Sequence, residues 1–172
     1  YRVFAPERID AIEYSIFDNQ PWPRWRIDLF TYHWSARRSF RRELGELGAV
    51  LLNEDDGGRA HADGIELTRY FGTAQWSLAT SVGWLDARYR SGEFAGIALE
   101  GRRLEDAPRY TASIVGSWRG ERGWFADLSL HLADATFLDA TNQSDARRPA
   151  TRLIDLCIGR RIGALDLFAY AN

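Results

Sequence analysis

Large apolar side chains alternate with small or polar ones along parts of this chain, and this period of two constrains the fold more than any other feature. In 75–89, alternate positions hold Trp76, Leu78, Thr80, Val82 and Trp84. The positions between them hold Ser77, Ala79, Ser81 and Gly83. In the same way, Leu128, Leu130 and Leu132 alternate with Asp127, Ser129 and His131. Successive side chains of a β-strand point to opposite faces of a sheet, so the pattern predicts strands with one apolar face.

This pattern predicts about eight strands along the chain. They cover residues 8–17, 25–36, 59–71, 75–89, 109–119, 124–138, 151–161 and 164–172. Several segments reach the length of about 9–11 residues that a tilted strand needs to cross a bilayer. No segment keeps a helical period, which argues against alternating strands and helices. We therefore expect an all-β, antiparallel fold.

The connections between the predicted strands are alternately short and long. The short ones are 18–24, 72–74, 120–123 and 162–163, and the long ones are 37–58, 90–108 and 139–150. Outer-membrane barrels have short periplasmic turns and long extracellular loops. The alternation therefore predicts an up-and-down transmembrane β-barrel, and it is less expected of a soluble sandwich.

Aromatic residues make up 13% of the chain and cluster toward the predicted strand ends. The clusters are Trp22 and Trp25, Tyr32 and Trp34, Tyr70 and Phe71, Trp118 and Trp124, and Phe168 and Tyr170. Such rings favour the headgroup region of a membrane, so the clusters predict two interfacial girdles. The alternative is the general preference of aromatic residues for strands.

Composition excludes several classes of protein. No apolar run approaches the about 18 residues of a spanning helix. The net charge of −2 predicts no nucleic-acid partner. The single cysteine, Cys157, excludes an internal disulfide framework and a site with several cysteine ligands. The sequence contains no Met and does not open on a signal-peptide pattern, so we expect a mature or truncated segment.

A series of short motifs, in chain order, resembles the barrel of TonB-dependent receptors. The motifs lie at 4–7 with 12–15, 27–32, Asn53 with 58–60 and 64–67, 85–89, 107–111 and 167–172. The third motif, which includes Gly64-Ile65-Glu66-Leu67, is the most specific. Two departures from the family pattern are the Asp- and Gly-rich stretch 54–58 and a last strand that is missing after Asn172.

The resemblance implies that residues 1–172 are a single domain, the C-terminal part of a barrel of about twenty-two strands. The plug domain and the TonB box of the family are absent from this sequence. Such receptors lie in the bacterial outer membrane, contact lipid and lipopolysaccharide, and take up scarce ligands, commonly ferric siderophores, with energy from the TonB complex. The resemblance implies no cofactor. The alternative function is a plugless or truncated barrel that acts as a passive pore or has a structural role.

Paired arginines in the predicted long loops are the candidate ligand contacts, because guanidinium groups bind anionic oxygens bidentately. The candidates are Arg41, Arg42, Arg102 and Arg103, and Arg147-Arg148 is a similar pair. Two alternatives remain open for these arginines. They could pair with nearby acids such as Glu105 and Asp106, or they could contact lipopolysaccharide phosphates.

The histidines do not predict an enzyme or a metal site. His61 and Asp63 are two residues apart on a predicted strand, so they share a face and could orient an imidazole. No nucleophile motif accompanies them, and His33 and His131 have no second ligand at metal spacing. An outer-membrane hydrolase on an eight-stranded barrel is therefore a weaker hypothesis than a receptor.

Overall fold

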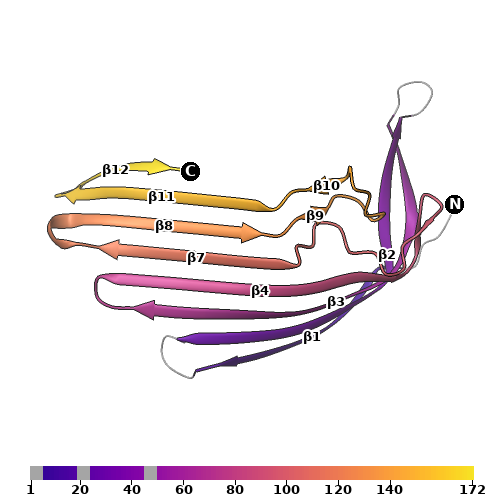
Figure 1. Ribbon diagram of the computed structural model, residues 1–172, viewed down its shortest axis with the longest axis horizontal. Helices are drawn as coiled ribbons and strands as arrows, with labels where there is room; N and C mark the ends of the chain where they lie inside the picture. Colours follow the sequence, from indigo (N-terminus) through magenta and orange to yellow (C-terminus); the bar gives the residue numbers. More distant parts are fainter. Residues whose placement is uncertain (1–5, 19–23, 45–49) are drawn as a thin grey trace.

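The computed structural model is built on one antiparallel sheet of eight strands, which follow one another along the sheet as they do along the chain (Figure 1). The strands are β1 (Arg8–Phe17), β2 (Trp25–Leu44), β3 (Val50–Gly72), β4 (Trp76–Ser91), β7 (Tyr110–Arg119), β8 (Trp124–Ala133), β11 (Thr151–Ile162) and β12 (Leu165–Ala171). A single 3-10 turn, η1 (Glu121–Gly123), precedes β8. The structure describes residues 6–18, 24–44 and 50–172, and for 38–44 and 50–57 it describes only the backbone. The predicted all-β antiparallel fold is confirmed.

All strands of the sheet except β12, which has 7 residues, reach or exceed the length needed to span a bilayer. β1, β7 and β8 have 10 residues each, whereas β2 has 20 and β3 has 23. A tilted transmembrane strand needs about 9–11 residues. In the described part of the chain, no helix is both long enough and apolar enough to cross a membrane.

The strand register gives the sheet two chemically different faces. Leu130 of β8 lies between Ile114 of β7 and Ile154 of β11, and we call this apolar side the outer face. The neighbouring Ser129 lies on the opposite, inner face and donates a hydrogen bond of 2.9 Å to Asp155. Ile154 is 57% exposed, so the apolar face is open to the surroundings. The predicted separation of the β8 leucines from their polar neighbours is confirmed.

Aromatic side chains of the outer face gather at the end of the sheet where the short turns lie. By register and alternation they are Trp25, Phe71, Trp76, Trp118 and Trp124. The rings of Trp76 and Trp118 are directly opposed on neighbouring strands, with centroids 6.0 Å apart. This group has the position and the amphipathic chemistry of an interfacial girdle.

At the other end of the sheet, part of the predicted girdle is wrong. Tyr32 and Trp34 lie on the inner face, with ring centroids 5.8 Å apart, and pack against buried residues of the sheet. Three members elsewhere in the sheet also lie on the inner face: Tyr70, Phe168 and Tyr170. Clustering near strand ends does not indicate a face, whereas alternation does. At the end of the sheet with the long connections, the aromatic pair on the outer face is Trp84 and Tyr110. The remaining predicted member, Trp22, lies outside the described residues.

The first predicted long loop, 37–58, is largely a β-hairpin. β2 and β3 continue to pair as far as Leu44 and Val50, and the hairpin projects from the rest of the sheet (Figure 1). The register shifts between Trp34 and Arg37, where Ala36 has a positive φ of 53°. Alternation marks a strand only where one of its faces is apolar. The sequence does not keep this alternation in 38–44 and 50–57, so the pattern stops before the strands do.

The structure also differs from the predicted strand pattern after β8 and between β4 and β7. β8 ends at Ala133 instead of 138, and the residues after it form β9 (Thr136–Phe137), which pairs with β10 (Arg147–Arg148). Within 90–108, β5 (Glu93–Phe94) pairs with β6 (Ile97–Ala98). The predicted alternation is confirmed, with short turns at one end of the sheet and the long connections at the other (Figure 1).

Replacing Leu130 with Arg should strongly reduce the folded yield of the intact protein, whereas Arg at Ser129 should be tolerated. An Arg near the middle of a lipid-facing strand costs about 2–4 kcal/mol. At 129 the guanidinium would lie on the inner face beside Asp155. Folded yield is measured as the heat-modifiable band on a gel. Equal yields, or the reverse order, would contradict the assignment of faces.

A second readout separates a membrane wall from the core of a soluble sandwich, which would also reject Leu130→Arg. Spin labels at 128, 130 and 132 should be accessible to oxygen dissolved in lipid and shielded from a water-soluble quencher. Shielding from both reagents would indicate a buried protein core.

Residues 1–172 refolded alone in detergent should not give a compact barrel. β1 and β12 form opposite edges of the sheet and do not pair with each other. Each unpaired backbone group on such an edge costs several kcal/mol in hydrocarbon. The measurement is heat-modifiable migration together with protease resistance. A protease-resistant monomer would mean that the eight strands close by themselves.

Candidate ligand-binding pocket on the inner face

The connection between β4 and β7 folds back and extends the sheet beyond the end of β7. Leu104 donates a backbone hydrogen bond of 3.0 Å to Ala87. Tyr89 donates to the carbonyl of Arg102 and accepts from the amide of Gly101, each at 2.9 Å. The connection therefore uses the free edge of β4 as a template, which positions the side chains of 99–105 against the sheet.

Small side chains on the inner face allow this connection to approach closely. Ala60, Ala62 and Ala87 are buried, and Leu99 and Leu104 of the connection belong to the same hydrophobic cluster. Leu99 is 0% exposed. Burying a leucine side chain stabilises the folded state by about 1.5–3 kcal/mol, so these two leucines anchor the connection. The cluster forms the main buried core of the described residues.

A pocket of about 450 Å³ lies beside this core on the inner face. Three aromatic residues of β2 form a ladder along one wall, with centroid distances of 5.4 Å from Phe30 to Tyr32 and 5.8 Å from Tyr32 to Trp34. The Tyr32 hydroxyl donates a hydrogen bond to Glu13 of β1, which orients the middle ring. The volume is typical of small-molecule sites, which combine apolar walls with a few polar groups.

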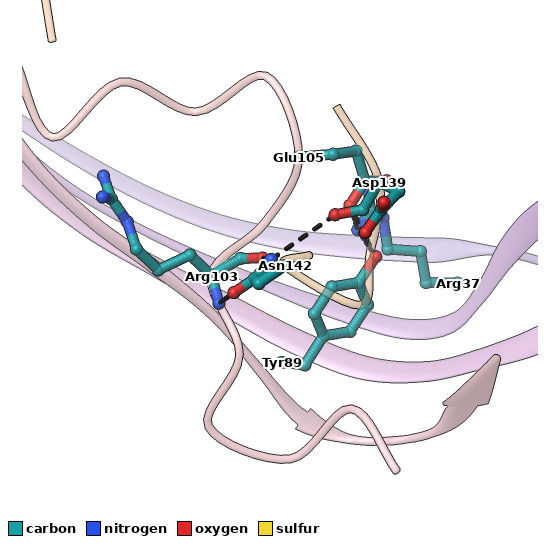
Figure 2. Close-up of polar contacts among 6 residues, drawn as sticks. All are labelled: Arg37, Tyr89, Arg103, Glu105, Asp139 and Asn142. Carbon is teal, nitrogen blue, oxygen red and sulfur yellow. Dashed lines mark hydrogen bonds and ion pairs between the residues drawn. The ribbon is translucent and has the colours of Figure 1, made fainter. Parts of the chain in front are cut away.

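Arg37, Tyr89 and Glu105 form a closed polar triad at the rim of the pocket (Figure 2). Arg37 donates to the Tyr89 hydroxyl at 2.6 Å and to the Glu105 carboxylate at 2.7 Å, and the Tyr89 hydroxyl donates to Glu105 at 2.7 Å. The side chains of Arg37 and Glu105 are 20% and 26% exposed. The triad joins the bulged part of β2 to the β4–β7 connection. Its hydrogen bonds involve charged groups, and such bonds are stronger than those between neutral groups.

A second contact joins the β4–β7 connection to the connection between β8 and β11 (Figure 2). The side-chain amide of Asn142 accepts a hydrogen bond from the backbone of Arg103 at 2.7 Å and donates to its carbonyl at 2.8 Å. Asn142 has a φ of 55°, a conformation that Asn tolerates better than most residues. An exposed ion pair of 2.9 Å between Arg148 and Asp106 adds to this contact.

The four arginines predicted to contact ligand lie in two different segments of the chain. Arg41 and Arg42 lie in β2, but their side chains are outside the described residues. The Arg102 side chain donates to the carbonyls of Ala98, at 2.9 Å, and of Thr141, so it links the two connections. The Arg103 guanidinium makes a longer contact of 3.4 Å with a backbone carbonyl and points away from the triad in Figure 2.

The triad and Asn142 were not among the predicted site residues. Pairing of the loop arginines with nearby acids such as Glu105 and Asp106 was one of the open alternatives. Asp106 pairs with Arg148, one of those arginines, and Glu105 pairs with Arg37 from a different hairpin. A positive φ occurs at both Ala36 and Asn142. Asn is enriched in this conformation, so Asn142 carried a weak signal, whereas Ala36 carried none.

His61 and Asp63 share a face, as predicted, with 3.9 Å between Nε2 of His61 and the Asp63 carboxylate. His61 is buried, and its Nδ1 has no hydrogen-bond partner. His33 lies directly across from His61 in the β2–β3 register. Among the described residues, no group of three or more His, Cys, Asp or Glu side chains is placed to hold a metal ion.

No family model matches the chain, and no curated protein matches it. Solved structures do match. The ferric yersiniabactin uptake receptor FyuA from Yersinia pestis aligns with a TM-score of 0.75 and 18% identity, covering 97% of this chain and 24% of the receptor. The ferric-catecholate import receptor Fiu from K12 E. coli gives a TM-score of 0.67 and 14% identity, covering 96% of this chain and 23% of that one. The siderophore receptor PiuA from Acinetobacter baumannii gives a TM-score of 0.57 and 14% identity, covering 85% of this chain and 24% of that one.

All three proteins are named as receptors and none as an enzyme. The resemblance seen in the sequence motifs is therefore confirmed at the level of the fold. The chain has the fold of a section of the β-barrel wall of siderophore receptors, and it spans 24% of the length of FyuA.

Proposed function

We propose that this chain forms part of the wall of an outer-membrane receptor that takes up a scarce ligand, a ferric siderophore or a similar chelate. The observation that carries the proposal is a sheet with one apolar face open to the surroundings and, on the other face, a pocket beneath connections that fold inward. The likeness to structures of siderophore receptors supports it.

The chemistry of the pocket suits such a ligand. The aromatic ladder from Phe30 to Trp34 offers ring faces for stacking. Arg37 at the rim is a cation that can bind the anionic oxygens of a chelate. Arg103 points away from the triad (Figure 2) and stays a candidate for a ligand contact outside the pocket. Arg41 and Arg42, on the projecting hairpin, remain candidates for the first contact with ligand. Uptake against a gradient would draw energy from the TonB complex through a plug domain and a TonB box elsewhere in the protein.

We also propose lipopolysaccharide as a partner at the outer rim. Tyr110 is exposed on the outer face at the end with the long connections, and the Arg109 guanidinium lies 5.6 Å over its ring. A stacked guanidinium at the height of the headgroups is suited to phosphate. The short turns, at the opposite end, would face the periplasm.

Uptake of ferric siderophore by the intact receptor should require TonB and the proton-motive force. Cells that express the receptor should accumulate radiolabelled iron chelate, and accumulation should stop in a tonB-null strain or after an uncoupler. The control is binding of the chelate at the cell surface, which should persist in both cases. Undiminished accumulation without TonB would favour the passive pore.

Arg103→Ala should weaken binding of the ferric chelate by about tenfold or more, because a hydrogen bond to a charged group contributes about 1.5–3 kcal/mol. The loops should stay ordered, since Arg103 holds Asn142 through its backbone. Arg102→Ala is the matched control, and it should instead increase hydrogen exchange in 98–104 and 139–142 because its side chain links these segments. Unchanged affinity in Arg103→Ala would remove Arg103 from the ligand site.

A further inference from the structure

A second hollow lies on the outer face of the sheet, on the side opposite the ligand pocket. It is a groove of about 460 Å³ that runs across β3, β4, β7, β8 and β11. One cross-strand row of residues lines its length: Phe71, Leu78, Gly116, Leu128 and Leu156. The next row toward the short turns contributes Trp76, Trp118 and Ala126. The groove crosses interior strands and does not involve the edge strands β1 and β12.

Small residues in these two rows create the hollow. Gly116 lies between Leu78 and Leu128, and Ala126 lies beside Trp118. A Cβ atom at Gly116 would meet the Leu78 Cδ1 atom at 3.5 Å, which is an ordinary van der Waals contact. The surroundings therefore tolerate a side chain at 116. Its absence leaves a depression between the larger apolar side chains.

The groove begins at the end of the sheet with the short turns. Phe71 is the next-to-last residue of β3 and Trp76 is the first residue of β4. In the orientation proposed above, this end faces the periplasm. Barrel strands are tilted, typically by about 35–45°, so a row that crosses them also climbs through the bilayer. The groove therefore extends from the periplasmic headgroup level near Phe71 into the hydrocarbon near Leu156.

A cation stands at the periplasmic end of the groove. Arg69 is exposed on the outer face, and its guanidinium lies 4.9 Å over the ring of Phe71. Among the described residues, no ion pair joins Arg69 to a carboxylate. Apolar walls that end at a stacked guanidinium complement an anionic phosphate attached to a hydrocarbon chain.

We propose that this groove binds one phospholipid of the periplasmic leaflet. One acyl chain would lie along the row from Phe71 to Leu156, and the phosphate would contact Arg69. The phospholipid, and not lipopolysaccharide, is the occupant because the groove opens at the end with the short turns. The inference rests on the proposed function only for the outer-membrane location and orientation of the barrel.

The test is native mass spectrometry of the intact receptor in detergent, titrated with palmitoyl-oleoyl phosphatidylethanolamine. The wild-type receptor should retain one lipid more tightly than the rest. Gly116→Phe should fill the groove and weaken that binding by about tenfold or more, which corresponds to about 1.4 kcal/mol. The matched control is Ala112→Phe on the same strand and face, between Val82 and Leu132 and outside the groove. This control should retain the lipid.

A second pair of variants tests the headgroup contact and does not depend on a bulky substitution. Arg69→Gln should weaken binding of phosphatidylethanolamine several-fold and leave binding of palmitoyl-oleoyl glycerol, which has no phosphate, unchanged. Arg160→Gln is the control. Arg160 also stacks on an outer-face ring, 5.5 Å over Trp124, but Trp124 does not line the groove, whereas Phe71 beneath Arg69 does. This control should behave like the wild-type receptor with both lipids.

Three results would overturn the proposal. The first is that Gly116→Phe retains the lipid. The second is that both Phe variants lose it equally, as expected of a general lipid annulus. The third is that Gly116→Phe abolishes a receptor dimer, which would make a second copy of the chain the occupant of the groove. Uptake of ferric chelate is assayed separately. A receptor that fractionates with the outer membrane and binds the lipid but transports nothing would refute the proposed function alone. A receptor that transports the chelate but holds no specific lipid would refute this inference alone.

Discussion

Hydrogen bonding between neighbouring strands is the constraint on which the rest of this structure depends. A backbone that crosses hydrocarbon has no water to bind, so each N–H and C=O group must find its partner in the next strand. The eight strands satisfy this in the simplest order, each pairing with its neighbours in sequence. The same ladder sets the register, and the register places Leu130 toward one side and Ser129 toward the other. Both the outer groove and the inner pocket follow from that register.

Where water can reach the backbone, the ladder is no longer obligatory. There the chain uses side chains to hold its connections in place. Arg37 and Glu105, helped by the Tyr89 hydroxyl, join the first hairpin to the β4–β7 connection. Asn142 joins that connection to the next one through two hydrogen bonds to the backbone of Arg103. These contacts shape the rim of a pocket whose walls belong to the rigid sheet, an arrangement suited to ligand binding.

Small residues have different consequences on the two faces. On the inner face, Ala60, Ala62 and Ala87 leave room that the β4–β7 connection fills with Leu99 and Leu104. On the outer face, Gly116 leaves room that no part of the described chain fills. The alternation of small and large residues along a strand therefore predicts its two faces correctly. It does not indicate which of the spaces beside the small residues are filled by other parts of the protein.

The sequence by itself determined most strands of the sheet, the faces of those strands and the ends at which they turn. The predicted bounds of the first strand, Arg8–Phe17, agree with β1, and the face assignment of Leu130 and Ser129 holds. This was possible because the period of two is a local property, visible wherever one face meets an apolar environment. It failed in the hairpin of β2 and β3, where the pattern disappears although the pairing continues.

Only the tertiary structure decided which loop residues meet. Arg37 and Glu105 are 68 positions apart, and Arg103 and Asn142 are 39 positions apart. Pairing with acids close in the sequence was one of the alternatives left open for Arg102 and Arg103, yet Glu105 binds Arg37 and Asp106 binds Arg148. The physical reason is that an ion pair depends on distance in space. In the loops that distance is set by the bulge at Ala36, by the turn at Asn142 and by the docking of the β4–β7 connection on the edge of β4, and no local pattern in the sequence records these together.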